Sequence, residues 1–194
     1  YPKYVIAVIC PEFRSRYYAS YLTLLHEELS KYNCEICVAA TDFSAKKEQD
    51  LLEYYTKYSA IDGIIIVNPR TELNTEIKIP LAVIGYKNFK KDVIVINSDL
   101  YNALYDAVQY FKENNVRDIG YIGERLTKHK FSCFKNAMTA NGIEYNEDFV
   151  VVTDQRFEEG GYYAMEKIFE TGRLPRVIIA AYDNMAFGAM RCIF

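Results

Sequence analysis

The sequence predicts an α/β protein made of two lobes, each a doubly wound parallel sheet. Its apolar runs are short and uninterrupted, which is typical of strands buried on both faces. Amphipathic segments with helical periodicity separate most of these runs, and this alternation is the signature of βαβ units. The rhythm breaks once, at 80–98, where two strands follow each other without a helix. We therefore expect one lobe at 1–97 and a second at 98–194.

The first lobe contains five predicted strands. They are expected at 4–9, 34–40, 61–67, 80–85 and 93–98. Helices are expected at 15–32 and 45–58, where apolar residues recur at three-and-four spacing. The turn Thr41-Asp42-Phe43-Ser44 supplies the N-cap of the second helix.

The second lobe repeats the alternation from its first residues. Its strands are expected at 118–123, 148–153 and 176–181. Its helices are expected at 100–114, 128–141 and 158–171, followed by a last helix that starts at Asp183. Asp99 is the predicted N-cap of the first of these helices, while Asn141-Gly142 and Gly172 end the second and third.

Composition excludes several classes of function. The 194 residues carry a net charge of −3, so the total shows no basic surface for nucleic acid. No apolar run approaches the roughly 18 residues of a membrane-spanning helix, and the N-terminus has no signal-peptide pattern. Five cysteines, an odd number, favour reduced thiols, so we expect a cytoplasmic protein without membrane contact.

The pair Cys34 and Cys37 has the spacing of a redox or zinc motif. The two thiols fall on a predicted strand, where positions three apart point to opposite faces. There is no second cysteine pair, and His26 and His129 are isolated in the sequence. Buried, reduced thiols are therefore favoured over a metal or redox site, and no metal is expected.

Enzyme and cofactor motifs are also absent from the sequence. Neither a dinucleotide-binding glycine pattern nor a P-loop occurs, and no nucleophile elbow is present. Gly120 and Gly123 lie too close together for a phosphate cradle and fall within a strand. We therefore expect neither a cofactor nor an enzymatic activity.

Polar and aromatic residues gather where the predicted strands end, which is where open α/β sheets bind ligands. In the first lobe these residues are Glu12, Phe13, Arg14, Arg16, Tyr17, Asp42, Asn68, Arg70, Tyr86 and Lys87. In the second they are Asp99, Glu124, Lys128, Lys130, Asp154 to Phe157, Tyr182 and Asp183. Aromatic faces beside carboxylates and long cations suit a polar, ring-shaped ligand.

Each of these residues also has a simpler interpretation. Asp42, Asp99 and Asp183 precede helices, so plain N-capping explains them as well. Arg14 and Arg16 also fit exposed loop charges. Lys128 and Lys130 fit charges on a solvated helix face in the same way.

The stretch "VIIAAYDNMAFGAM" (177–190) resembles the A-N-D-x-M-A-x-G-A element of the LacI/GalR family and of related periplasmic sugar-binding proteins. Other segments resemble the family in the same order, namely "YVIAVICPEF", "AIDGIIIV", "VINSDLYNA", "VRDIGYIG" and "FEEGGYYAM". The resemblance implies a type I periplasmic-binding-protein-like fold, in which two lobes are hinged around a cleft for a small molecule.

The resemblance also implies ligand contacts in this sequence. Lys130 stands where the family often has an effector-binding arginine, and Tyr182 replaces the asparagine before the retained Asp183. Arg156, with Phe157 beside it, matches a position where some relatives stack an aromatic ring on the ligand. The complete set of candidate ligand-binding residues is Phe13, Arg16, Tyr17, Asp99, Lys130, Arg156, Phe157, Tyr182 and Asp183.

The function implied by the resemblance is that of an effector-binding domain of a LacI-type transcriptional repressor. A small-molecule effector, in the first instance a sugar, would change the angle between the lobes and so control operator binding. The exchanges at Lys130 and Tyr182 leave a purine, an amino sugar or a phosphosugar open as the ligand. Expected partners are a second copy of the chain and operator DNA. The DNA would be bound through an N-terminal helix-turn-helix that precedes residue 1, and we expect the domain to continue beyond residue 194.

Two other classes of protein stay open at this point. One is a sugar-binding protein of an ABC transporter, which shares the fold but would require a signal peptide and an oxidising compartment for five cysteines. The other is an α/β enzyme with a similar layout, for which the sequence offers no nucleophile, metal set or phosphate cradle.

Overall fold

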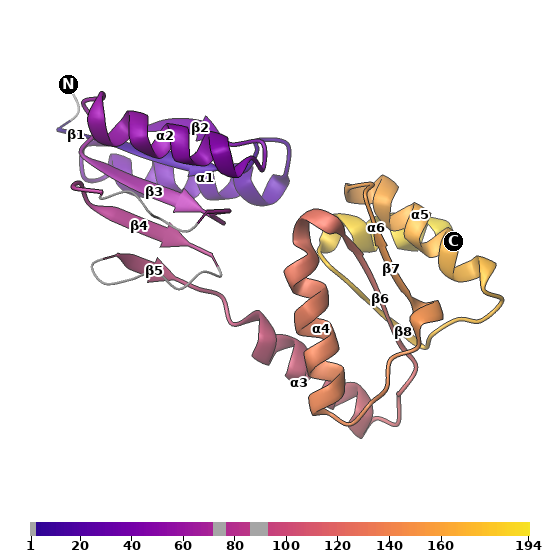
Figure 1. Cartoon of the computed structure of the whole chain (residues 1–194). Coiled ribbons are helices and arrows are strands. Elements are labelled where there is room, and N and C mark those ends of the chain that lie inside the picture. The colour runs from indigo at the N-terminus through magenta and orange to yellow at the C-terminus, as the bar shows by residue number, and fades with distance from the viewer. Residues whose placement is uncertain (1–2, 72–76, 86–92) are drawn as a thin grey trace. The chain divides into compact units, whose positions relative to one another are not determined.

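The computed structural model describes residues 3–71, 77–85 and 93–194. The chain divides into two compact units between Ser98 and Asp99 (Figure 1). Each unit has its own parallel sheet and its own hydrophobic core.

The first unit has a five-stranded sheet in the order β2-β1-β3-β4-β5. Its elements are β1 (Tyr4–Cys10), α1 (Arg16–Ser30), β2 (Cys34–Ala40), α2 (Ala45–Lys57), β3 (Gly63–Val67), β4 (Leu81–Ile84) and β5 (Ile94–Ile96). All neighbouring pairs are parallel, and β1 lies between β2 and β3. Because β5 pairs with β4, both strands within 80–98 belong to the first sheet.

Alternate residues of β1 face opposite layers of the first unit, which explains its uninterrupted apolar run. Ala7 and Ile9 pack in a cluster with Leu52 of α2. Val8 and Cys10 pack in a different cluster with Tyr18 of α1. The two helices therefore cover opposite faces of the sheet, as right-handed parallel crossovers require.

The second unit has a three-stranded sheet in the order β7-β6-β8. Its elements are α3 (Leu100–Glu113), β6 (Ile119–Glu124), the 3₁₀ turn η1 (Arg125–Thr127), α4 (Lys128–Ala140), η2 (Glu147–Phe149), β7 (Val150–Thr153), α5 (Phe157–Glu170), β8 (Val177–Ala180) and α6 (Asp183–Ile193). In Figure 1, α3 and α4 lie on one side of this sheet and α5 and α6 on the other. Strand β6 is central and is buried along its whole length.

The expected elements are present, with small differences at their ends. Ser44 caps α2, because its side chain accepts a hydrogen bond from Lys47 N at 3.2 Å. Asp99 caps α3 in the same way, by accepting a hydrogen bond from Asn102 N at 3.1 Å. The strand expected from residue 148 begins at Val150, because the preceding residues form the turn η2. Asp183 is the first residue of α6, whose N-cap is Tyr182.

Glycines bring α5 and α6 into very close contact. A Cβ added at Gly161 would overlap the Met185 carbonyl group, and one added at Gly188 would overlap the Glu158 carbonyl group. Backbone therefore meets backbone where the helices cross, and only hydrogen atoms fit at these positions. The contact fixes the start of α5 against α6, and both starts border the carboxyl end of the second sheet.

Replacing Gly188 by Ala tests this packing. Helix propensity alone would stabilise the unit, since Gly is about 1 kcal/mol less favourable than Ala inside a helix. We expect instead a loss of about 1–3 kcal/mol in the free energy of unfolding, because the methyl group forces the helices apart. Urea unfolding followed by circular dichroism measures the difference. Ser20→Ala, in the exposed part of α1, is the control and should be neutral or slightly stabilising; a stabilised Gly188→Ala protein would contradict the close contact.

Candidate functional site

A buried carboxylate lies at the carboxyl end of the second sheet. Glu124 is the last residue of the central strand β6, and only 1% of its surface is exposed. A charged group in this position is unfavourable unless other groups pair with it. Its partners come from the segments that follow the two neighbouring strands.

Arg156 and Tyr182 both bond to the same oxygen of Glu124. Arg156 Nε donates to Oε2 at 2.9 Å, forming an ion pair, and Tyr182 Oη donates to Oε2 at 2.9 Å. Arg156 follows β7 and Tyr182 follows β8, so one carboxylate holds both flanking segments. We refer to Glu124, Arg156 and Tyr182 as the Glu124 network.

Phe157 has an unusual backbone conformation beside this network. Its φ is +57°, in the left-handed region, which costs a bulky residue about 1–2 kcal/mol. Its N–H donates to Tyr182 Oη at 3.0 Å, and its ring lies 4.5 Å beneath the Arg156 guanidinium carbon. The Phe157 and Tyr182 rings meet edge to face, with centroids 6.2 Å apart. These contacts hold the strained residue and leave two aromatic rings beside a cation.

Lys130, on α4, reaches the same end of the sheet. Its Nζ donates to the carbonyl oxygen of Ala181 at 2.8 Å and lies 5.7 Å from the centre of the Tyr182 ring. Burial lowers the pKa of Lys130, and the negative charges of Glu124 and Asp183 oppose that shift. The ammonium group is thus a half-buried donor beside an aromatic ring.

Two tyrosine hydroxyls in this region are kept neutral. Burial raises the pKa of Tyr182 well above its usual value; the hydrogen bond from Phe157 opposes this shift, and the nearby Glu124 charge adds to it. Burial also raises the pKa of Tyr121, on β6, with a further contribution from the charges of Cys133 and Glu124. The Tyr121 hydroxyl is buried and has no hydrogen-bond partner among the described residues.

The structure brings part of the predicted site together in the second unit. Lys130, Arg156, Phe157 and Tyr182 are joined by the contacts above. Asp183 adjoins them, and its side chain accepts a hydrogen bond from Asn184 N at 2.9 Å. Asp99 is exposed and caps α3, so its contacts are those of a helix cap.

In the first unit, three predicted residues gather at the start of α1. Phe13 and Tyr17 are half exposed, and Arg16 is the first residue of the helix. The Tyr17 ring contacts the rings of Tyr18 and Tyr21, at centroid distances of 5.1 and 4.9 Å. A role of these residues in ligand binding stays a prediction. Tyr86 and Lys87 lie outside the described residues.

Glu124 is the residue that the sequence interpretation did not select. The sequence places it among the polar residues at the strand ends, but it is not one of the candidate ligand-binding residues. Its partners Arg156 and Tyr182 are 32 and 58 residues further along the chain. The sequence offers one signal of a buried anion at this edge. A cation, Arg156, follows one neighbouring strand, and a hydrogen-bond donor, Tyr182, follows the other.

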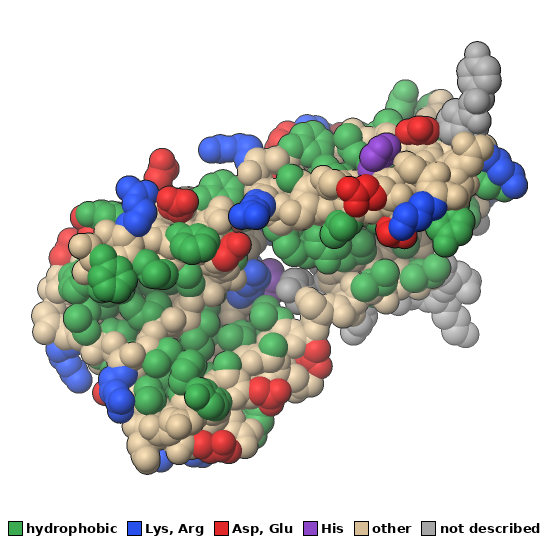
Figure 2. Space-filling model, turned by 180° about the vertical axis from the view of Figure 1, so that it is seen from behind, with side chains coloured by type: hydrophobic (Ala, Val, Ile, Leu, Met, Phe, Trp, Pro, Cys, Tyr) green, Lys and Arg blue, Asp and Glu red, His purple; other side chains and the backbone are tan. Residues whose placement is uncertain are grey.

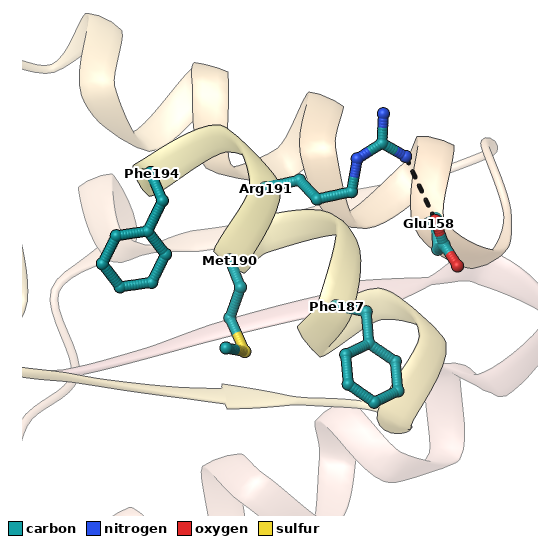
Figure 3. Close-up of a pocket in the computed structure, with 5 residues that line it drawn as sticks. All are labelled: Glu158, Phe187, Met190, Arg191 and Phe194. Carbon is teal, nitrogen blue, oxygen red and sulfur yellow. Dashed lines mark hydrogen bonds and ion pairs between the residues drawn. The ribbon is translucent and has the colours of Figure 1, made fainter.

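A separate hollow lies on α6 and borders the start of α5. It has a volume of about 440 Å³ and is lined by Glu158, Phe187, Met190, Arg191 and Phe194 (Figure 3). Apart from the ion pair between Arg191 and Glu158, at 3.1 Å, its walls are apolar side chains. None of these five residues belongs to the Glu124 network.

The described part of the chain contains neither a cluster of metal ligands nor a disulfide bond. Residues 3–71, 77–85 and 93–194 contain no group of three or more His, Cys, Asp or Glu side chains placed to hold a metal ion. The five cysteines are unpaired, with Cys34 buried and Cys37 exposed on β2. On the face seen in Figure 2, basic and acidic side chains of the described residues are interspersed.

None of the helices in the described ranges is both long enough and apolar enough to span a bilayer.

Comparison with known proteins defines the class of this fold. Residues 108–194 match the family model of the periplasmic binding protein-like domain. The HTH-type transcriptional repressor PurR of Pasteurella multocida (strain Pm70) is 26% identical, over 97% of this chain and 59% of its own length. The chain thus spans less than two thirds of this relative.

Two solved structures agree with this comparison. A putative LacI-family transcriptional regulator from Sanguibacter keddieii DSM 10542 superposes with a TM-score of 0.81 at 20% identity, covering 97% of this chain and 70% of that one. The Cra transcriptional dual regulator from Pseudomonas putida, in complex with fructose 1-phosphate, gives a TM-score of 0.77 at 16% identity, covering 97% and 73%.

The fold and the polar strand ends therefore define a periplasmic-binding-protein-like domain. Within that class, the chain is similar to the PurR repressor in sequence and to a LacI-family transcriptional regulator in fold. The relatives reported above are regulators and not enzymes.

Tyr182→Phe tests the Glu124 network. The substitution removes one donor to Glu124 Oε2 and the acceptor of the Phe157 N–H, while keeping the ring. We expect the free energy of unfolding to fall by about 1–3 kcal/mol, since a buried group then lacks a partner. Chemical unfolding of the two proteins measures this. Tyr110→Phe, at an exposed position on α3, is the matched control and should change stability by less than about 0.5 kcal/mol.

Lys130→Met tests the burial of the lysine charge. The pKa of Lys130 is lowered from 10.5 in the folded protein, so the unfolded chain binds more protons in the range between the two values. The stability of the wild-type protein relative to Lys130→Met should therefore rise as the pH increases towards the ordinary lysine pKa of 10.5. Urea unfolding at several pH values measures the difference. Lys128→Met, at an exposed position, is the control and measures the effect of removing a lysine charge that is not buried. If the free energy of unfolding of the wild-type protein, relative to Lys130→Met, fell as the pH rises, burial of the Lys130 charge would be contradicted.

Proposed function

We propose that this chain senses a small molecule and thereby controls DNA binding by the regulator to which it belongs. The effector would be a polar, ring-shaped molecule, in the first instance a sugar, bound at the carboxyl end of the second sheet. The observation that carries the proposal is the grouping of Lys130, Arg156, Phe157 and Tyr182 around the buried Glu124.

The chemistry of these side chains suits such a ligand. Tyr182 and Phe157 offer ring faces and edges on which a sugar or heterocyclic ring packs. Lys130 has three N–H donors, of which one bonds to Ala181, so the other two can donate to a ligand. Ligand sites in open α/β sheets lie at this end of the strands.

The relatives support a regulatory role. The Pasteurella multocida protein is a transcriptional repressor, and the Pseudomonas putida regulator binds fructose 1-phosphate in its crystal structure. In the whole protein, effector binding would change operator affinity through a coupling free energy of about 1–3 kcal/mol. We propose a cytoplasmic location and a homodimer on the same basis.

The two units are proposed to be the lobes of this domain, with boundaries near 1–97 and 98–194. Phe13, Arg16 and Tyr17 of the first unit, and Asp99 and Asp183 of the second, are further proposed contacts. Their polar and aromatic side chains are of the kind that bonds ligand hydroxyl or carbonyl groups.

A thermal-shift screen of sugars and nucleobases tests the proposal. A ligand at about 100 times its Kd stabilises the folded protein by about 2.7 kcal/mol, which should raise the Tm by several degrees. For the ligand found, Tyr182→Ala should weaken binding by at least about ten-fold, because a buried aromatic contact is lost.

Tyr162→Ala, at an exposed position on α5, is the matched control and should leave the Kd unchanged. The proposed site is wrong if a ligand binds equally well to Lys130→Ala, Tyr182→Ala and Asp183→Ala. The proposed function is wrong if neither sugars nor nucleobases bind.

A further inference from the structure

One atom of the Glu124 network has no partner. Oε2 of Glu124 accepts two hydrogen bonds, each of 2.9 Å, from Arg156 and Tyr182. Oε1 is buried and has no hydrogen-bond partner among the described residues. A buried carboxylate oxygen in this state is unfavourable, and a hydrogen-bond donor from a ligand would relieve that cost.

The charges around this oxygen also restrict the ligand. Arg156 is already paired with Glu124, so its positive charge is largely neutralised there. Lys130 lies near two acidic groups, Glu124 and Asp183, whose charges both act on its pKa. An anionic ligand would therefore place a further negative charge beside a buried carboxylate, without a cation reserved for it.

Access to Oε1 depends on the side chains that cover it. The Arg156 side chain is 23% exposed, whereas the Glu124 side chain is fully buried, so solvent reaches the network on the Arg156 side. A ligand donor that displaces the side chains over Oε1 can bond this oxygen while Arg156 and Tyr182 keep their hydrogen bonds to Oε2.

We propose that Glu124 is a specificity-determining residue of the effector site, which accepts an O–H or N–H donor of the ligand and rejects phosphorylated ligands. This inference rests on the proposed function and goes further, because it names the charge class of the effector. The site selects an uncharged or cationic molecule with a hydrogen-bond donor that reaches Glu124 Oε1.

Matched pairs of neutral and phosphorylated ligands test this inference. We would measure the Kd of ribose against ribose 5-phosphate, fructose against fructose 1-phosphate, and adenosine or guanosine against its 5′-monophosphate. Isothermal titration calorimetry would be run with wild-type and Glu124→Gln proteins at one salt concentration. We expect the wild-type protein to prefer the neutral member of the pair that it binds by at least about ten-fold.

Glu124→Gln keeps the shape and one acceptor but removes the negative charge. We expect it to reduce the preference for the neutral member by at least about ten-fold, partly through weaker neutral binding and partly through stronger binding of the phosphate. A purely structural role for Glu124 would weaken both members alike, so the ratio of the two Kd values separates the two roles. Glu144→Gln, at an exposed position, is the control and should keep the wild-type ratio.

The outcomes are distinct. The inference is overturned if the wild-type protein prefers the phosphorylated member, if it binds both equally, or if Glu124→Gln leaves the ratio unchanged. In each of these cases a ligand still binds, so the proposed function survives. If no member of any pair and no molecule in the thermal-shift screen binds, the proposed function is wrong and the inference falls with it.

Discussion

The negative charge of Glu124 sits at the end of the central strand of the second sheet, where water does not reach it. It is compensated by an arginine that follows one neighbouring strand and by a tyrosine that follows the other. Parallel strands make this arrangement available, because all three carboxyl ends emerge at the same edge. The tyrosine in turn holds the Phe157 backbone in a strained conformation. Loss of the carboxylate would therefore release both flanking segments at once.

The first unit uses a buried carboxylate in a comparable way. Glu48, on α2, accepts hydrogen bonds from the backbone N–H groups of Arg70 and Thr71, at 2.8 to 3.0 Å, and from the Thr71 hydroxyl. These residues follow β3, so a helix side chain fixes a loop at the carboxyl end of a strand. In both units, segments that carry polar side chains are attached to the scaffold by a charge that solvent does not screen.

Most of the fold could be predicted from local patterns, whereas the centre of the candidate site could not. Uninterrupted apolar runs identified strands such as β3 and β6, because both faces of these strands are covered. The grouping of Lys130, Arg156, Phe157 and Tyr182 followed from the rule that parallel strands end at one edge, although their role in binding stays a prediction. The burial of Glu124 depends on partners 32 and 58 residues away, and no local pattern records such a contact. The turn before β7 was missed although its cause is local: the Asn146 side chain accepts a hydrogen bond from Asp148 N, and the strand begins only at Val150.

The crossing of α5 and α6 at Gly161 and Gly188 has a mechanical consequence. Helices that meet backbone to backbone cannot slide past each other without a steric clash, so α5 and α6 move together as a rigid body. One end of this helix pair begins beside Tyr182, and α6 ends 11 residues further on, at Ile193. At about 1.5 Å per residue, α6 is roughly 16 Å long. A tilt of a few degrees at the aromatic rings would thus displace the far end of α6 by about an ångström.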